Sequence, residues 1–202
     1  MTSPVRLLIL ASASTSRARV LTAAGIPFRA VPANVDESDC KTKLKAEGAS
    51  SLKCAETLAE IKALAVSRQN PDAIVIGADQ LLDCGGVWFD KPADRAEARE
   101  HLTALSGKTH QLATAAVAVR AGARIWHHVS APRLSVRTLS PQFIDAYLEA
   151  AGDGVLSSVG AYHLEGLGAQ LFENVEGDFF TILGVPLLAL LAFLREHGIV
   201  PR

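Results

Sequence analysis

Two short apolar runs, each followed at once by small or polar residues, most constrain the fold. The first occupies residues 5–10, and the second, AIVIGA, occupies residues 73–78. Continuous runs of this length are typical of strands that helices cover on both faces. A serine-rich turn follows the first run, and the pattern over 17–24 that Gly25 closes is helical. This part of the chain therefore predicts a strand, a loop and a helix.

Further helices follow from apolar spacing and from capping residues. Apolar side chains recur at helical spacing between 52 and 66, which predicts a long amphipathic helix that carries Lys62. Asp94 and Glu97 form a capping-box pattern at the start of another helix. Another helix is expected to begin at Pro141, because proline suits the first helical position.

The remaining signals predict strands. Asp79 follows the second apolar run and is expected at the end of that strand, and the glycine pair at 85–86 predicts a hairpin turn. Residues 110–120 and 125–136 are rich in Val, Ala and Thr and predict paired strands. Together these elements predict an α/β protein with a mixed twisted sheet flanked by helices, and with an antiparallel hairpin lobe.

Two segments are less regular. Residues 38–50 have almost no apolar content, so a mobile surface connection is expected there. Residues 179–194 are apolar but interrupted by Gly184 and Pro186; they are too short for a membrane helix of about 20 residues. A strand, a turn and a buried helix are expected instead. Without an evident linker, the sequence predicts one domain over residues 1–202.

Composition narrows the class of protein. A hydrophobic content of 49% supports a folded core, and a net charge of −1 favours a small anionic ligand over nucleic acid. Cys40, Cys54 and Cys84 form no C-x-x-C pair, which indicates free thiols in a reducing compartment. The first apolar run is too short for a signal peptide. We therefore expect a cytoplasmic protein that binds neither nucleic acid nor membrane.

The turn after the first run is a candidate anion site. It brings Ser12, Ser14 and Ser16 to the start of a helix, followed by Arg17. Backbone N–H groups and the helix dipole favour an anion there, and Arg17 can make bidentate phosphate contacts. The alternative is that Ser14 only caps the helix and Arg17 lies in solvent.

Carboxylates and lysines supply the complementary groups. Asp36, Glu37 and Asp79 each follow an apolar segment, an arrangement that suits a hard divalent cation. Lys62 and Lys91 could neutralise a polyphosphate, although solvated surface residues are the alternative for all five. The histidines at 110, 127 and 128 lack ligand spacing, so packing is expected for them.

Eight segments, taken in order, resemble the Maf family of nucleoside triphosphate pyrophosphatases. They are LASASTSR at 10–17, VDE at 35–37, LAEIKA at 58–63, GADQ at 77–80, DKP at 90–92, LSGKTHQLAT at 105–114, GAYHLEGLG at 160–168 and GVPL at 184–187. The resemblance implies a fold like that of Maf proteins and inosine triphosphatases, a small-molecule nucleotide substrate, and a homodimer.

The resemblance also implies roles for individual residues. The groups that grip the triphosphate would be Ser12, Ser14, Arg17, Lys62 and Lys91. Asp79 would accept a proton from the water that attacks the α-phosphorus, and Glu37 would belong to the metal or substrate site with Mg²⁺ or Mn²⁺. The sequence leaves open whether Asp79 is a general base or mainly a metal ligand.

Three positions bear on the nucleobase. By the resemblance, Ser16, Gln80 and Glu165 occupy the specificity positions of the family. Gln80 and the EGLG segment are closer to the subgroup that acts on 7-methyl-GTP than to the one that acts on dTTP and UTP. A carboxylate at Glu165 suits a guanine edge and the positive charge of N7-methylguanine. The alternative is that Glu165 points to solvent or caps the glycine loop.

The expected reaction is hydrolysis of a nucleoside triphosphate to the monophosphate and pyrophosphate. One rival is a nucleotide-binding regulator of cell division without turnover, and another is a phosphatase that releases orthophosphate. Loss of Asp79 or of the lysines would favour the regulator, and all of them are present.

Overall fold

The computed structural model describes residues 7–202, so residues 5 and 6 of the first predicted strand lie outside it. Its strands are β1 Leu8–Leu10, β2 Arg29–Ala30, β3 Ile74–Cys84, β4 Val87–Phe89, β5 Thr109–Arg120, β6 Ala123–Ser130, β7 Arg133–Val136 and β8 Phe172–Glu176. They are hydrogen-bonded in the order β2-β1-β3-β5-β7-β8, with β4 on β3 and β6 on β5. β1 is parallel to β2 and β3, whereas the pairs that involve β4, β6, β7 and β8 are antiparallel. The predicted mixed sheet is confirmed.

The helices account for the flanking layers. They are α1 Thr15–Ala23, α2 Glu37–Ala46, α3 Ser51–Ser67, α4 Arg95–Leu105, α5 Pro141–Ala151, α6 Phe179–Ile182 and α7 Leu187–Glu196, with 3₁₀ helices η1 Gly152–Ser157 and η2 Leu167–Leu171. The cap predicted at α4 is confirmed, because the Asp94 carboxylate accepts from the Glu97 N–H; the Glu97 carboxylate reaches back to the Ala93 N–H, one residue before the N-cap. No helix within residues 7–202 is long and apolar enough to cross a membrane.

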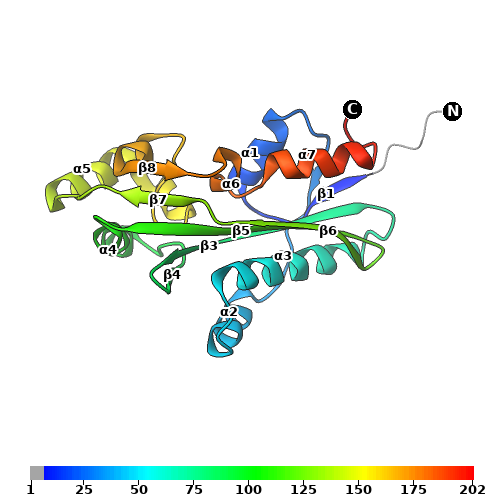
Figure 1. Cartoon of the computed structure of the whole chain (residues 1–202), viewed down its shortest axis with the longest axis horizontal. Helices are drawn as coiled ribbons and strands as arrows, with labels where there is room; N and C mark the ends of the chain where they lie inside the picture. The colour runs from blue at the N-terminus through cyan, green and yellow to red at the C-terminus, as the bar shows by residue number, and fades with distance from the viewer. Residues whose placement is uncertain (1–6) are drawn as a thin grey trace. The chain divides into compact units, whose positions relative to one another are not determined.

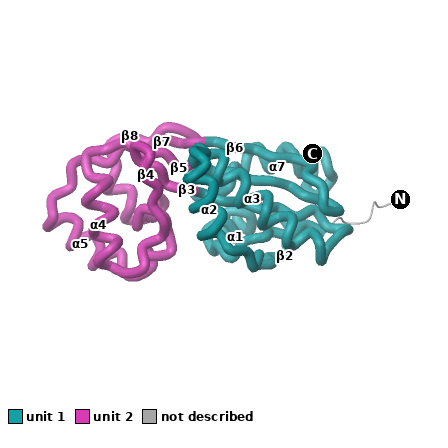
Figure 2. Tube along the Cα trace, turned by 90° about the horizontal axis from the view of Figure 1, so that it is seen from below, with its two compact units in different colours: residues 1–80, 114–130, 179–202 teal, residues 81–113, 131–178 magenta. Residues whose placement is uncertain are grey.

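The chain divides into two compact units (Figure 2). Unit 1 holds residues 7–80, 114–130 and 179–202, and unit 2 holds residues 81–113 and 131–178. The chain passes from one unit to the other within β3 and again within β5. The assignment of the chain to one domain stays a prediction.

Unit 1 is layered about its part of the sheet. Figure 1 shows α1, α6 and α7 over one face and α3 over the other. The core on the α1 and α7 side consists of buried apolar side chains from both strands and helices, which include Leu8, Leu10, Ile74, Ile76, Val20, Leu21, Leu190 and Leu194. Leu8–Leu10 of the first apolar run and all of residues 73–78 are therefore buried, as predicted, whereas Leu7 is 48% exposed.

Unit 2 packs α4 against α5, and the buried apolar side chains of these two helices include Leu102, Leu105, Ile144 and Leu148. Its hairpin joins β3 to β4 through the glycine pair at 85–86, whose φ angles of 62° and 87° are left-handed. This turn confirms the predicted hairpin, because glycine adopts such angles without a steric cost.

His110 is a buried member of unit 2. Its Nε2 lies 2.7 Å from the Tyr162 hydroxyl, and the side chain of Phe172 packs beside both rings. Burial lowers the pKa of His110 to about 4, so the ring is neutral at physiological pH. The expected packing role is confirmed for this histidine.

The segment at 38–50 was wrongly expected to be a mobile connection, since most of it forms α2. Asp36 caps this helix by accepting from the N–H groups of Ser38 and Asp39. Acidic residues occupy the first turn and lysines the last, which suits the helix dipole. No residue of α2 is buried, so this helix has no apolar pattern that the sequence could reveal.

Three strand predictions also need correction. Residues 125–136 form two strands, because Pro132 lies between β6 and β7 and lacks a ladder N–H. The strand expected after residue 178 is the short helix α6. Asp79 lies inside β3, which continues to Cys84, and is not at its end.

Candidate active site

The loop after β1 runs beside β3. The Ala11 N–H donates to the Ile76 carbonyl at 2.7 Å, in register with the Leu10 to Ile76 pairing of the two strands. Ser14 then caps α1, and its hydroxyl accepts from the Arg17 N–H at 3.3 Å. The N-terminus of α1 thus lies at the carboxyl end of a parallel strand, a usual place for anion binding in α/β proteins.

Arg17 is held by protein contacts and does not lie in solvent. Its Nε donates to the Gly184 carbonyl at 3.0 Å, and its Nη1 donates to the Ser12 hydroxyl at 3.2 Å. Burial lowers the pKa of Arg17, while the negative charges of Asp79 and Glu37 oppose that effect. The guanidinium remains charged, and its other N–H groups can bind an anion.

Lys62 brings two of the predicted carboxylates together. Its Nζ lies 2.6 Å from Asp79 Oδ1 and 2.9 Å from Glu37 Oε1. The side chains of Lys62 and Asp79 are only 8% and 7% exposed, whereas that of Glu37 is 42% exposed. Asp79 Oδ2 is buried and has no hydrogen-bond partner within residues 7–202.

A glycine in β3 explains why Lys62 reaches Asp79. A Cβ at Gly77 would lie 2.0 Å from the Ala59 carbonyl oxygen and 2.9 Å from the Ala63 nitrogen. The backbones of α3 and β3 can approach this closely only because residue 77 has no side chain. Asp79 is two residues further along the strand and faces the same helix.

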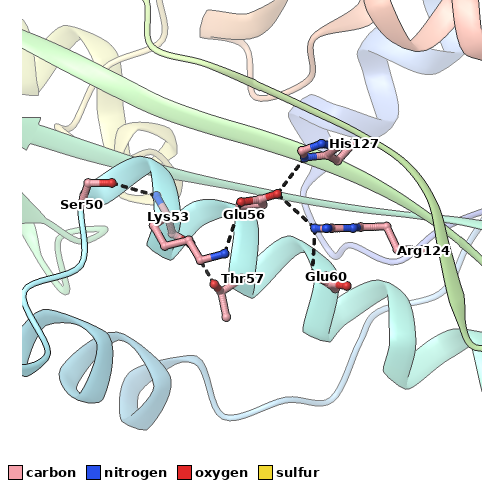
Figure 3. A network of polar contacts seen from close by, with 7 residues as sticks. All are labelled: Ser50, Lys53, Glu56, Thr57, Glu60, Arg124 and His127. Carbon is pink, nitrogen blue, oxygen red and sulfur yellow. Dashed lines mark hydrogen bonds and ion pairs between the residues drawn. The ribbon is translucent and has the colours of Figure 1, made fainter.

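A polar network fixes α3 against β6 on the same face of unit 1 (Figure 3). The Glu56 carboxylate lies 2.7 Å from His127 Nδ1 and 3.1 Å from Arg124 Nη1, which also contacts Glu60 at 3.3 Å. Partial burial raises the pKa of Glu56, but Lys53, His127 and Arg124 outweigh it, so the net pKa is lowered. The network therefore anchors the helix that carries Lys62. His127 makes a polar contact across two elements and is not a core side chain.

Gln80 points to the opposite face of β3 from Asp79, toward α6. Its Nε2 donates to Thr114 Oγ1 at 2.8 Å and to the carbonyls of Thr181 and Ile182 at 3.0 and 3.2 Å. These acceptors require the amide nitrogen, so the oxygen is the atom that Gln80 could offer to a ligand. Thr114 and Thr181, which no sequence motif singled out as site residues, contribute to this arrangement from distant parts of the chain.

The other candidates are placed as follows. Ser16 is half-buried in α1. Lys91 is exposed in the connection between β4 and α4 of unit 2. Glu165 is exposed in the turn before η2, also in unit 2. This turn is tightly folded, because a Cβ at Gly168 would lie 2.5 Å from the His163 carbonyl oxygen.

The chemistry of the Asp79 and Glu37 carboxylates fits a hard divalent cation. No group of three or more His, Cys, Asp or Glu side chains suited to a metal occurs among the described residues. Mg²⁺ is, however, commonly held by one or two carboxylates together with substrate phosphates. Glu37 and Asp79 form such a pair, and the buried Asp79 Oδ2 still lacks a partner in the described part of the chain.

Known proteins resemble this chain over most of its length. Residues 7–197 match the family described as Maf-like protein. A nucleoside triphosphate pyrophosphatase of Paramagnetospirillum magneticum is 59% identical over 94% of this chain and 98% of its own length. A 7-methyl-GTP pyrophosphatase of Rhizobium meliloti is 50% identical over 96% of this chain and 98% of its own length. A nucleoside triphosphate pyrophosphatase of Granulibacter bethesdensis is 50% identical over 94% and 96%, respectively.

Proposed function

The chain belongs to the Maf family, and we propose that it hydrolyses a nucleoside triphosphate to the nucleoside monophosphate and pyrophosphate. The observation that carries the proposal is the convergence of Lys62, Asp79 and Glu37, with Arg17 electrostatically coupled to both carboxylates. A triphosphate needs several cationic groups and a metal before water can approach it. Unit 1 supplies Lys62 and Arg17 for this purpose, and Lys91 is proposed as a further cation.

In the proposed reaction, water attacks the α-phosphorus. A bond forms between the water oxygen and phosphorus, the bond from phosphorus to the bridging oxygen breaks, and pyrophosphate leaves with the electron pair of that bond. Asp79 accepts the proton that the water loses, and Oδ2, which lacks a partner in the described residues, is the oxygen suited to take it. Lys62 holds Oδ1 and thereby orients the carboxylate.

We propose Mg²⁺ or Mn²⁺ as the cofactor, held by Asp79 and Glu37. When bound, such an ion supplies charge neutralisation of the phosphates and lowers the pKa of water. Ser12 and Ser14 are proposed to bind phosphate at the N-terminus of α1, where Ser12 also holds Arg17 in place.

Product analysis tests the proposal. The purified protein is incubated with a panel of nucleoside triphosphates, with and without Mg²⁺, and after exhaustive chelation. Pyrophosphate and monophosphate in equal amounts, lost on chelation, are the expected result. Orthophosphate would indicate a phosphatase, and tight nucleotide binding without turnover would indicate the regulator. Full turnover after chelation would contradict the metal site.

For the base, we propose a preference for an N7-methylated guanine nucleotide over dTTP and UTP. The chemistry of Glu165 supports it, because a carboxylate accepts hydrogen bonds from a guanine edge and attracts the positive charge of N7-methylguanine. The fixed Gln80 amide supports it as well, since its oxygen can accept from a guanine N–H. That oxygen alone does not exclude uracil, so Glu165 carries the selectivity. Ser16, the third specificity position, is proposed to contact the substrate.

The Glu165→Gln variant tests this base preference. It is expected to lower kcat/KM for 7-methyl-GTP and GTP by about tenfold, with little change for dTTP and UTP, because the amide loses the charge. Glu173→Gln, an exposed carboxylate of β8 in the same unit, is the matched control. Equal losses on all four nucleotides would make Glu165 a structural residue. A wild-type preference for dTTP or UTP would contradict the assignment to the 7-methyl-GTP subgroup.

A cytoplasmic location and a homodimer complete the proposal. The free thiols Cys40, Cys54 and Cys84 support a reducing compartment. The homodimer is supported only by the resemblance to the family, and light scattering at micromolar concentration decides it.

A further inference from the structure

The turn between α6 and α7 receives hydrogen bonds from two candidate site residues. Gln80 Nε2 donates to the carbonyls of Thr181 and Ile182, and Arg17 Nε donates to the carbonyl of Gly184. Thr181 and Ile182 are the last residues of α6, and Gly184 lies in the turn that follows, so all three carbonyls are at or beyond the end of a helix. Side chains that come from α1 and β3 therefore complete the hydrogen bonding of one short segment.

The turn itself is fixed on the core. The Gly184 N–H donates to the Thr181 carbonyl at 3.0 Å, and the Val185 N–H donates to the Phe180 carbonyl at 3.2 Å. Val185 and Leu187, which follow, are buried in the core of unit 1. The turn can thus serve as a fixed acceptor for Arg17.

Gly184 suits this contact in two ways. Its φ of 98° is positive, a conformation that residues with a side chain rarely adopt. A Cβ there would lie 3.2 Å from Arg17 Nε and 3.5 Å from Arg17 Cγ, which is closer than ordinary van der Waals contact for the nitrogen. A side chain at this position would therefore push against the guanidinium that the carbonyl holds.

We propose that Gly184 is a positioning residue for Arg17. Its carbonyl fixes Nε, and its missing side chain leaves room for the Arg17 side chain, so that the remaining N–H groups can bind the triphosphate. Ser12 fixes Nη1 from the other side. This inference rests on the proposed function for the identity of the anion, but the geometry of Arg17 does not depend on turnover.

The test is the Gly184→Ala variant, measured for binding of inorganic tripolyphosphate and for steady-state kinetics. Tripolyphosphate has no nucleobase, so its affinity measures the binding of the phosphate groups alone. We expect affinity to fall by about tenfold or more, the size of one lost charge-assisted hydrogen bond. KM for the nucleotide should rise by a similar factor.

Gly198→Ala is the matched control, because Gly198 also has a positive φ of 68° and lies in unit 1, where a Cβ added to it would meet nothing within 4 Å. It should bind tripolyphosphate as the wild type does. The second readout is a double-mutant cycle with Arg17→Met: Gly184→Ala should have no further effect in that background, because the group it positions is gone.

Three outcomes would overturn the inference. They are wild-type affinity in Gly184→Ala, an equal loss in Gly198→Ala, and the same fold-loss for Gly184→Ala whether or not Arg17 is present. If the wild type binds tripolyphosphate but releases no pyrophosphate from any nucleotide, the proposed function fails while the binding test of Gly184 still stands. Thermal unfolding of each variant shows that the protein tested is folded.

Discussion

Replacing Asp79 with Asn is expected to lower kcat by about 10²–10⁴-fold, the usual cost of a lost general base. The amide keeps the size of the side chain but cannot take a proton from water at neutral pH. The fold should survive, because Lys62 retains Glu37 at 2.9 Å as a carboxylate partner. Kinetics on the best nucleotide of the panel, with circular dichroism as the check on folding, measure both effects.

Asp72→Asn is the control for Asp79, since Asp72 is an exposed aspartate just before the same strand. It should retain wild-type kcat. The affinity of the Asp79→Asn variant for Mn²⁺, measured by calorimetry, separates the two roles that the sequence left open. An unchanged affinity with lost turnover identifies a base, and a lost affinity identifies a metal ligand. Turnover within a few-fold of wild type would refute both.

The elements that the sequence predicted well are those with local signals. The buried strands β1 and β3 follow from continuous apolar runs, and α4 follows from a capping box that involves only Asp94 and Glu97. α2 was missed because its stability comes from an N-cap, from charges near its ends and from contacts with α3, and none of these leaves an apolar period. The break at Pro132 was missed because β-branched and aromatic residues before it, such as Ile125 and Val129, and Val136 after it favour a strand.

In the candidate site, as in the fold, some features could be predicted from the sequence and others could not. The types of residue were predictable, because a polyphosphate needs cations and a metal needs carboxylates. Their partners were not, because the contacts join distant residues: Arg17 and Gly184 are separated by 167 positions, and Gln80 and Thr181 by 101. Periodicity and capping report on neighbours within a few residues, so they cannot show which distant carbonyl a side chain reaches.

Lys62→Met is expected to reduce the free energy of unfolding by about 3–5 kcal/mol, as found when one partner of a buried ion pair is removed. Methionine fills a similar volume but leaves the Asp79 carboxylate, 7% exposed, without its counter-ion. Asp79→Asn should cost less, because Glu37 still neutralises the ammonium. Lys53→Met on the same helix is the control: that lysine is 61% exposed and its 3.5 Å pair with Glu56 is worth little.

The double variant Lys62→Met with Asp79→Asn decides whether the buried charge is the cause. Urea unfolding should show that the double variant is more stable than Lys62→Met alone, because no unpaired carboxylate remains at position 79.

The response to a divalent cation is a second test of the charge at position 62. Lys62→Met keeps both carboxylates and loses the ammonium that repels a metal, so Mn²⁺ should raise its Tm by more than it raises that of the wild type. If the losses in free energy of unfolding of the two single variants simply add in the double variant, and Mn²⁺ raises the Tm of Lys62→Met no more than that of the wild type, then Lys62 contributes packing and not charge.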